Sequence, residues 1–378
     1  MVKRFVLISL LGILNLQLCF AQSDYLATLE TKALFNRLMQ TSKSIQSDQK
    51  IIIGQQNAFT EKRGWRISNN DLGSPLSSDM FDVANIHPAV FGLDFNEFGS
   101  WNREALIEKI QQNNEAGGIF TLSWHMPTLI HDGKGNDSFD DTTSKVVTHI
   151  LPGGKSHHLY LEKLNSLTSF LNEIKEIPVI FRPFHEHNAS WFWWGKKHCT
   201  IEEFKKLWKF TYNYLSEKGI HNLLYAYSPN HITSDYFERY PGDEFVDILG
   251  VDMYFKNYAV DVFEHGLSPL KNWKHNVLWL LQAAEKRNKI PAITEFGQEG
   301  SWYKNFWTDY MSWPLEKKGI AQILNGEKAP SLGVAYVMLW RNDKSDPKHF
   351  FGPVPGHLNN HNFDILMDKN IYLGLPTF

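Results

Sequence analysis

This sequence has few cysteines and no excess of positively charged residues. Two Cys occur among 378 residues, and the formal net charge is −3 at pH 7. So few cysteines cannot form the several disulfides that hold small secreted domains together. Without an excess of Lys and Arg, the chain also lacks the electrostatic footprint of a nucleic-acid binder. The sequence has no evident internal repeats or long low-complexity runs, which indicates an ordinary globular protein.

The one long apolar run lies at the amino terminus. Lys3 and Arg4 precede an apolar stretch from Phe5 to Leu18, and Cys19-Phe20-Ala21 supplies small residues at the outer positions of a cleavage site. The run is too short to span a membrane comfortably. We therefore expect residues 1–21 to be a signal peptide that is removed on export.

Cleavage there would leave residues 22–378 as a secreted or periplasmic protein with no membrane span. Lipid attachment at Cys19 is less expected, because Gln17-Leu18 fits a lipidation signal poorly. Removal of Cys19 would leave Cys199 without a partner for an intramolecular disulfide. With 43% hydrophobic and 21% charged residues, a chain of this length can bury one large core and does not demand two domains.

Short apolar runs alternate with amphipathic segments along the rest of the chain. The predicted strands are Ile51–Gln55, Ala89–Phe95, Ile119–His125, Val179–Glu186, Leu223–Ser228, Val246–Tyr254, Ala292–Phe296 and Val334–Trp340. The predicted helices are Tyr25–Ser47, Arg103–Ala116, His158–Lys175, Ile201–Lys218, Trp273–Arg287 and Trp302–Leu324. Near-continuous apolar strands joined by helices are typical of a parallel sheet that is covered on both faces.

Eight such units predict an α/β fold of the (β/α)₈ TIM-barrel type, as a single domain. An open doubly wound sheet is the alternative, but no glycine-rich phosphate turn follows the first strand, where Ile51–Gln56 leads into Asn57. Turn-rich segments at Pro127–Lys155 and Asp343–Phe363 follow the third and eighth strands. In a barrel they would lie on the face that carries active sites.

Polar and aromatic residues gather at the ends of the predicted strands. In a barrel these ends converge on one mouth, and five such ends together are the pattern expected of an active site. They are Ser123-Trp124-His125, His185-Glu186, Asp252-Met253-Tyr254, Thr294-Glu295-Phe296-Gly297 and Trp340-Arg341-Asn342.

The most informative stretch is Val179–Gly195, which reads VIFRPFHEHNASWFWWG. If Val179–Glu186 is a strand, Arg182, Phe184 and Glu186 share one face and His185 lies on the other. A strand-end carboxylate followed by several Trp is typical of the floor of a sugar site. The alternative interpretation is a buried aromatic corner with a structural Arg–Glu pair.

Glycoside hydrolysis requires two carboxyl groups that flank the bond to be cleaved. Glu186 and Glu295 are the only Glu residues that close predicted strands. Glu299 follows four residues later but would lie beyond its strand. A catalytic Zn²⁺ is not expected, because neighbouring strand residues such as His185 and Glu186 would point to opposite faces and could not easily share a metal.

RPFHE–N–SWFWWG closely resembles the acid/base motif of glycoside hydrolase family 26, and PAITEFGQEG around Glu295 resembles the nucleophile region of that family. The resemblance covers nearly all of residues 22–378. It implies a retaining β-mannanase without a cofactor, in which Glu186 is the acid/base and Glu295 the nucleophile. His187 stands where the family usually has Met, and Met126-Pro127-Thr128 replaces a common Asn-Pro.

The resemblance and the strand-end positions together indicate which side chains meet the sugar. They are His125, His185, Trp191, Tyr254, Trp340, Arg182, Trp124 and Arg341. Tyr254 would also donate to Glu295, Trp340 would form a platform under a sugar ring, and Arg182 would orient the carboxylates. For Trp193 and Trp194 the sequence leaves two positions open, the wall of the cleft and the core.

The expected partner is a β-mannan polysaccharide or oligosaccharide, acted on by a monomer. Two alternatives stay open. Some members of the family cut mixed-linkage β-glucan or β-1,3-xylan, and the chain could instead be a carbohydrate-binding barrel without catalysis.

Overall fold

The computed structural model describes residues 22–43, 50–62, 65–66, 78–129, 138, 145–255, 269–301, 303–312, 329–343, 346, 348–358, 360–369 and 372–375. The predicted signal peptide lies outside these residues. So do about half of the loop Pro127–Lys155 and more than half of the predicted helix Trp302–Leu324, within which Trp307–Ser312 forms a π-helix.

Each of the eight predicted strands is present, and two of them are divided. They are β1 (Ile51–Gln56), β4 (Val90–Asp94), β5 (Ile119–Ser123), β6 (Val179–Arg182), β7 (Leu223–Tyr227), the pair β8 (Ile248–Leu249) and β9 (Asp252–Phe255), the pair β10 (Ile290–Pro291) and β11 (Ile293–Gln298), and β12 (Tyr336–Leu339). Nearly every residue in these strands is buried, as expected for a sheet that is covered on both faces.

The order of the strands shows that the sheet closes on itself. Neighbours run β10-β8-β7-β6-β5-β4-β1-β12-β11-β9, and all these pairs are parallel. One end of this order is β10-β8 and the other is β11-β9. Each end contains one half of the sixth strand and one half of the seventh, so the two ends are continuous with each other. A parallel bridge between Asn230 and Asp252 joins the segment after β7 to β9. The chain is thus a single (β/α)₈ barrel, as predicted.

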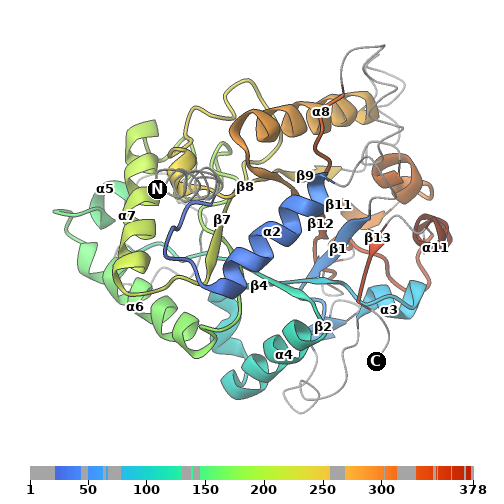
Figure 1. Cartoon of the computed structure of the whole chain (residues 1–378), viewed down its shortest axis with the longest axis horizontal. Coiled ribbons are helices and arrows are strands. Elements are labelled where there is room, and N and C mark those ends of the chain that lie inside the picture. Colours follow the sequence, from blue (N-terminus) through green and yellow to red (C-terminus); the bar gives the residue numbers. More distant parts are fainter. Residues whose placement is uncertain are drawn as a thin grey trace, which may run out of the picture.

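Helices surround the barrel (Figure 1). The long ones are α2 (Leu29–Lys43), α4 (Arg103–Glu115), α6 (His157–Glu173), α7 (Ile201–Glu217) and α8 (Pro269–Arg287). In α7, Thr200 and Glu203 form a capping box, which satisfies backbone N–H groups at the start of the helix. Its apolar face, which includes Phe204, Leu207 and Trp208, is buried against the barrel and contributes to the single hydrophobic core.

Sequence reasoning missed the shortest elements. These are the hairpin β2 (Glu61–Lys62) and β3 (Trp65–Arg66), β13 (Tyr372–Leu373), the helices α3 (Asp79–Ala84), α5 (Val146–Ile150) and α11 (Asn360–Asp368), and the 3-10 helices Phe95–Ser100, Asp243–Phe245 and Glu299–Ser301. Each is too short to show a clear periodicity. None of the helices in the described part of the chain is long and apolar enough to cross a membrane.

One prediction was wrong in a way that shapes the site: β6 ends at Arg182 and does not continue to Glu186. Pro183 follows and cannot donate to a strand ladder. Phe184 and Glu186 then adopt the left-handed region, with φ of 50° and 53°. Such conformations cost about 1–3 kcal/mol each for residues other than glycine and occur preferentially at functional sites. The tight turn removes the expected alternation of faces.

The other end of the barrel is closed by α2, which crosses the view in Figure 1. Thr28 N donates to His221 O over 3.0 Å, Arg37 Nη1 donates to Gly117 O over 2.8 Å, and Ser42 O accepts from Gly333 N over 2.7 Å. His221, Gly117 and Gly333 precede β7, β5 and β12. The helix therefore seals the amino-terminal mouth, opposite the strand ends that carry the predicted site.

A buried carboxylate fastens the start of the described chain to this closed end. Asp247, which precedes β8, is fully buried and accepts from Ser23 N over 2.6 Å, from Ser23 Oγ over 2.8 Å and from Tyr225 N over 2.8 Å. Its carboxylate thus joins three parts of the chain that are far apart in sequence.

We expect Asp247→Ala to lower the free energy of unfolding by about 3 kcal/mol, because it leaves buried donors without an acceptor. Urea denaturation measures the effect. The matched control is Glu244→Ala, an exposed carboxylate three residues away, which should change stability by less than about 0.5 kcal/mol. Equal effects of the two substitutions would contradict this account of the closed end.

Candidate active site

Glu295 lies at the centre of the barrel mouth, on β11, and is held from two sides. Arg182 Nη2 donates to its Oε1 and Tyr254 Oη donates to its Oε2. Only 3% of Glu295 is exposed. Burial and the negative charge of Glu295 raise the pKa of Tyr254 well above its ordinary value, so its hydroxyl keeps the proton that it donates. The predicted contact between Tyr254 and Glu295 is present.

Arg182 is the buried cation that compensates the acidic groups. Its Nη1 also donates to Asp252 Oδ2 over 2.8 Å, and Thr294 Oγ1 donates to Asp252 Oδ1 over 2.6 Å. Burial alone would lower the pKa of Arg182, but Asp252 and Glu295 outweigh burial and raise it. The guanidinium therefore stays charged. It fixes the orientation of Glu295, the task that the sequence assigned to Arg182.

Glu186 occupies a different environment, although it faces the same space. Its Oε2 accepts from Trp191 Nε1 over 2.8 Å, and its Oε1 accepts from Asn230 Nδ2 over 2.7 Å. Burial and the negative charge of Glu295 raise its pKa to about 7, although the two hydrogen bonds and Arg182 act in the opposite direction. Near neutral pH, Glu186 can therefore hold a proton, while Arg182 and Tyr254 surround the carboxylate of Glu295.

Asn230 was missed by sequence reasoning, because it lies after β7, outside the predicted strand. Asn188 Nδ2 donates to Asn230 O over 2.6 Å, and Asn230 N donates to Asn188 Oδ1 over 2.7 Å. This reciprocal pair of bonds fixes the backbone of Asn230, the residue whose side chain donates to Glu186. The SPNH run that ends at His231 was the available signal, since a polar cluster directly after a barrel strand lies at the mouth.

The spacing of the carboxylates distinguishes between two hydrolytic geometries. Oxygen atoms of Glu186, Asp252 and Glu295 all lie within 4.8 Å of one another. Retaining glycosidases hold their two carboxyl groups about 5–5.5 Å apart, whereas inverting enzymes leave about 6.5–9.5 Å for a water molecule. The short spacing fits direct attack by a carboxylate.

The same oxygen atoms could in principle hold a metal ion. Arg182 already donates to Asp252 and to Glu295, so a cation placed among them would compete with the guanidinium. The prediction that His185 and Glu186 point to opposite faces of a strand was wrong. His185 and Glu186 lie in the turn after β6, where strand alternation does not apply. The absence of a catalytic metal remains a prediction.

Two histidines lie beside the carboxylates. His185 Nε2 is 3.1 Å from His125 Nε2, and the ring centroids are 4.5 Å apart. The structure therefore brings His125 and His185 together, from the ends of β5 and β6. Only 1% of His185 is exposed, whereas the His125 side chain is 27% exposed.

Aromatic rings form the walls around these groups. Trp340 follows β12, and its ring centroid lies 6.2 Å from that of His125 and 6.4 Å from that of Tyr254. Trp191 is 40% exposed while its indole donates to Glu186. Phe351, which was not predicted, lies 5.0 Å from Tyr254 between ring centroids. Exposed Trp beside carboxylates provides an apolar surface on which a sugar ring can pack.

Other predicted residues lie elsewhere. Trp124 is 3% exposed and meets Phe95 edge-on at 5.4 Å, so it belongs to the core and not to the group around Glu295. Trp193 and Trp194 are fully buried core residues. The guanidinium of Arg341 pairs with the carboxylate of Asp343 at 3.3 Å.

The family departure at His187 has a packing explanation. His187 is 1% exposed, and its ring lies 4.7 Å from Phe204 and 4.6 Å from Tyr227 between centroids. Burial lowers its pKa well below the ordinary value, so the ring is neutral. A neutral imidazole therefore packs between the rings of Phe204 and Tyr227.

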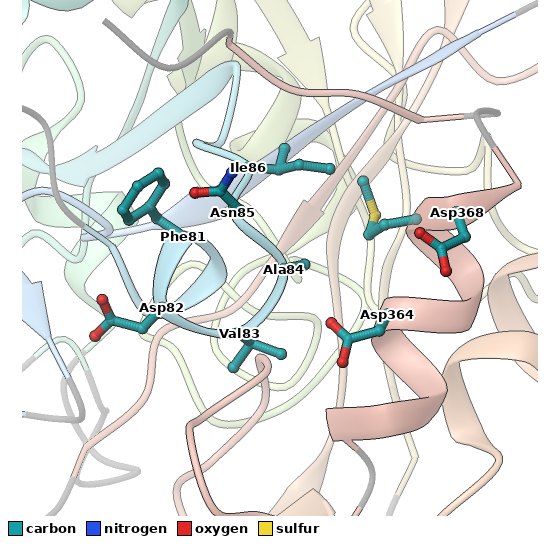
Figure 2. A pocket seen from close by; sticks show the side chains of 9 residues that line it. Phe81, Asp82, Val83, Ala84, Asn85, Ile86, Asp364 and Asp368 are labelled. Atoms are coloured by element: carbon teal, nitrogen blue, oxygen red, sulfur yellow. The ribbon is translucent and has the colours of Figure 1, made fainter.

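A surface hollow of about 440 Å³ lies between α3 and α11. Figure 2 shows Asp364 and Asp368 facing Asn85 and Ile86 across it. None of the residues around the carboxylate pair lines this hollow. The candidate site is therefore the barrel mouth.

A close carboxylate pair at the mouth of a (β/α)₈ barrel, after its fourth strand and on its seventh, fits the geometry of a retaining glycoside hydrolase. The model of glycosyl hydrolase family 26 matches residues 24–326. The chain belongs to glycosyl hydrolase family 26.

Curated relatives include a mannan endo-1,4-beta-mannosidase of Bifidobacterium adolescentis, which is 34% identical over 85% of this chain and 32% of the relative. A Bacillus subtilis mannan endo-1,4-beta-mannosidase is 39% identical over 48% of this chain and 55% of the relative. The chain thus spans about a third to a half of the length of these relatives.

Two solved structures are similar over almost their whole length. A GH26 β-mannanase from Bacteroides ovatus aligns with a TM-score of 0.76 and 32% identity, covering 92% of this chain and 95% of the other. The catalytic domain of a Bacillus sp. JAMB-750 GH26 endo-β-1,4-mannanase aligns with a TM-score of 0.78 and 28% identity, covering 94% of each chain. Both likenesses support the single-barrel fold.

Proposed function

We propose that this chain is a retaining endo-β-1,4-mannanase that acts on mannan, glucomannan or galactomannan. The observation that carries the proposal is the close pair Glu186 and Glu295, held in contrasting environments within 4.8 Å. Both curated relatives described above are mannan endo-1,4-beta-mannosidases, which supports the choice of substrate.

In the proposed reaction, Glu295 attacks the anomeric carbon while Glu186 gives its proton to the leaving oxygen. Arg182 and Tyr254 hold Glu295 in position through both carboxylate oxygens. The raised pKa of Glu186, about 7, lets it carry that proton near neutral pH. Glu186 then takes a proton from water, which attacks the glycosyl-enzyme and restores Glu295. Electrons and protons balance without a cofactor.

The alkaline limb of kcat/KM should reflect the ionisation of Glu186, so activity should fall as the pH rises through about 7. Trp191 donates to Glu186 and favours its ionised form. We expect Trp191→Phe to raise the pKa of Glu186 further and to move the alkaline limb upward by up to about one pH unit. Trp340→Phe is the control, because the described hydrogen bonds to the Glu186 carboxylate come from Trp191 and Asn230. A downward shift in Trp191→Phe would contradict the assignment.

The substrate proposal is tested on a panel of polysaccharides. Purified residues 22–378 should release reducing ends from β-1,4-mannan at least about tenfold faster than from mixed-linkage β-glucan or β-1,3-xylan. Pocket contacts commonly produce discrimination of this size. A Glu295→Ala preparation controls for contaminating activity. Faster release from glucan or xylan would favour the other family activities, and binding of mannan without release would favour a non-catalytic barrel.

Residues 1–21 are proposed to direct export, so that the enzyme acts as a secreted or periplasmic monomer. The basic start, the apolar stretch and the small residues around Ala21 support this proposal. Export suits a substrate that is too large to enter a cell.

A further inference from the structure

Asp94, His125 and His185 form a line of hydrogen bonds at the barrel mouth. His125 Nδ1 lies 2.7 Å from Asp94 Oδ2, and His125 Nε2 lies 3.1 Å from His185 Nε2. Asp94 ends β4 and is 4% exposed. It also accepts from Ser123 Oγ over 2.8 Å and from His125 N over 2.9 Å, so its carboxylate is rigidly held.

This geometry restricts where the protons can be. An ionised carboxylate only accepts hydrogen bonds, so His125 Nδ1 must be the donor to Asp94. Of the two facing Nε2 atoms, one must donate and the other accept. If His125 Nε2 carries a proton, then His125 is a cation and neutral His185 carries its own proton on Nδ1. If His125 Nε2 carries no proton, both rings are neutral and His185 Nε2–H donates to His125 Nε2.

The charges around His125 favour the cation. Asp94 from β4, Glu295 from β11, Arg182 from β6 and His185 from the turn after β6 act on it, and the rings of Phe192 and Trp340 complete its surroundings. Burial lowers the pKa of His125, but Asp94 and then Glu295 outweigh burial and the opposing charge of Arg182, so the pKa is raised.

His185 has the opposite preference. Burial, Arg182 and His125 lower its pKa well below the ordinary value. The pKa of Asp94, which burial alone would raise, is held below its ordinary value by His125 and Ser123. The lowered pKa values of His185 and Asp94 both agree with an ionised Asp94, a charged His125 and a neutral His185.

We propose that Asp94 is a positioning residue that fixes the proton of His125 on Nδ1 and keeps His125 positively charged, with Nε2–H directed at neutral His185. The Asp94–His125 pair then forms a dipole whose positive end lies nearer the carboxylates of the site. The positive charge of His125 favours the ionised form of Glu295, which is the form that acts as a nucleophile. The catalytic part of this inference rests on the proposed function, whereas the proton arrangement does not.

The first test is NMR of the full chain labelled with ¹⁵N-histidine, with the His125 signals assigned by comparison with His125→Gln. In the wild type, His125 should keep a proton on Nδ1 throughout the titration and should lose the Nε2 proton only above the ordinary pH range of histidine. A neutral His125 that carries its proton on Nε2 would overturn the proposal, whatever the activity of the enzyme.

The second test uses Asp94→Asn, which keeps the shape of the side chain and removes its charge. The His125 midpoint should fall by about 1–3 pH units, as expected when an opposite charge is lost. Ser123→Ala, which removes a hydrogen bond to Asp94 but not the charge, should leave the midpoint raised. An unchanged midpoint in a folded Asp94→Asn protein would overturn the proposal.

Kinetics then separate positioning from simple support of the fold. If the chain is a mannanase, Asp94→Asn should lower kcat about tenfold or more, with the largest loss at pH values where only wild-type His125 is charged. KM should change less. A loss of activity that is uniform across pH would show that Asp94 acts through the fold alone.

Discussion

Glu295→Ala is expected to abolish turnover on every substrate, with a loss in kcat of about 10⁴-fold or more. Without the carboxylate no covalent intermediate can form, and no other described group takes its place between Arg182 and Tyr254. The measurement is hydrolysis of both mannan and an aryl β-mannoside. An activated leaving group should not rescue this variant, because attack on the anomeric carbon is the step that has been lost.

Glu299→Ala is the matched control for this substitution. Glu299 follows β11, in the 3-10 helix Glu299–Ser301, and so lies outside the strand that carries Glu295. Its loss should leave kcat within a few-fold of the wild type. If Glu299→Ala lowered kcat as much as Glu295→Ala does, the assignment of Glu295 as the nucleophile would be contradicted. Circular dichroism should confirm that both variants are folded.

Glu186→Ala should behave differently, because it removes proton transfer but not the nucleophile. Turnover of mannan should fall by about 10²–10⁴-fold, the usual contribution of a general acid and base. An aryl mannoside with a good leaving group does not need protonation, so formation of the glycosyl-enzyme should survive. Release of the intermediate should then be slow, because no base activates water.

Azide is a nucleophile that needs no base, so it should accelerate this slow step in Glu186→Ala. Two inversions at the anomeric carbon give a β-mannosyl azide. Azide should not accelerate the wild type, whose Glu186 activates water, and Glu295→Ala, which forms no glycosyl-enzyme, should give no β-mannosyl azide. An α-mannosyl azide would show that the roles are reversed or that the reaction inverts configuration.

The strand–helix alternation could be predicted from sequence because each barrel strand is a short apolar run that is buried on both sides. The closed ring, the order of strands and the two candidate carboxylates follow from this pattern, since parallel strand ends converge at one mouth. Elements such as α3, α5 and β13 could not be predicted in this way. They are stabilised by contacts with distant segments, and none is long enough to show a period.

The details of the site depended on contacts between distant parts of the chain. Arg182 and Glu295 are 113 positions apart, and Glu186 and Asn230 are 44 apart. Sequence placed Arg182 and Glu186 on one strand face, whereas the structure ends the strand at Arg182 and turns His185 and Glu186 together toward the mouth. Strand periodicity cannot foresee a left-handed turn that tertiary hydrogen bonds stabilise.

The sequence by itself determined the barrel, the chemistry available at its strand ends and the pair of glutamates, because these depend on residue type and on order along the chain. Only the tertiary structure decided that Glu186 is buried beside another carboxylate, that Trp124 belongs to the core and that Asp94 reaches His125. Electrostatic environment depends on distance in space and on exclusion of water. Neither distance in space nor exclusion of water can be deduced from the spacing of residues along the chain.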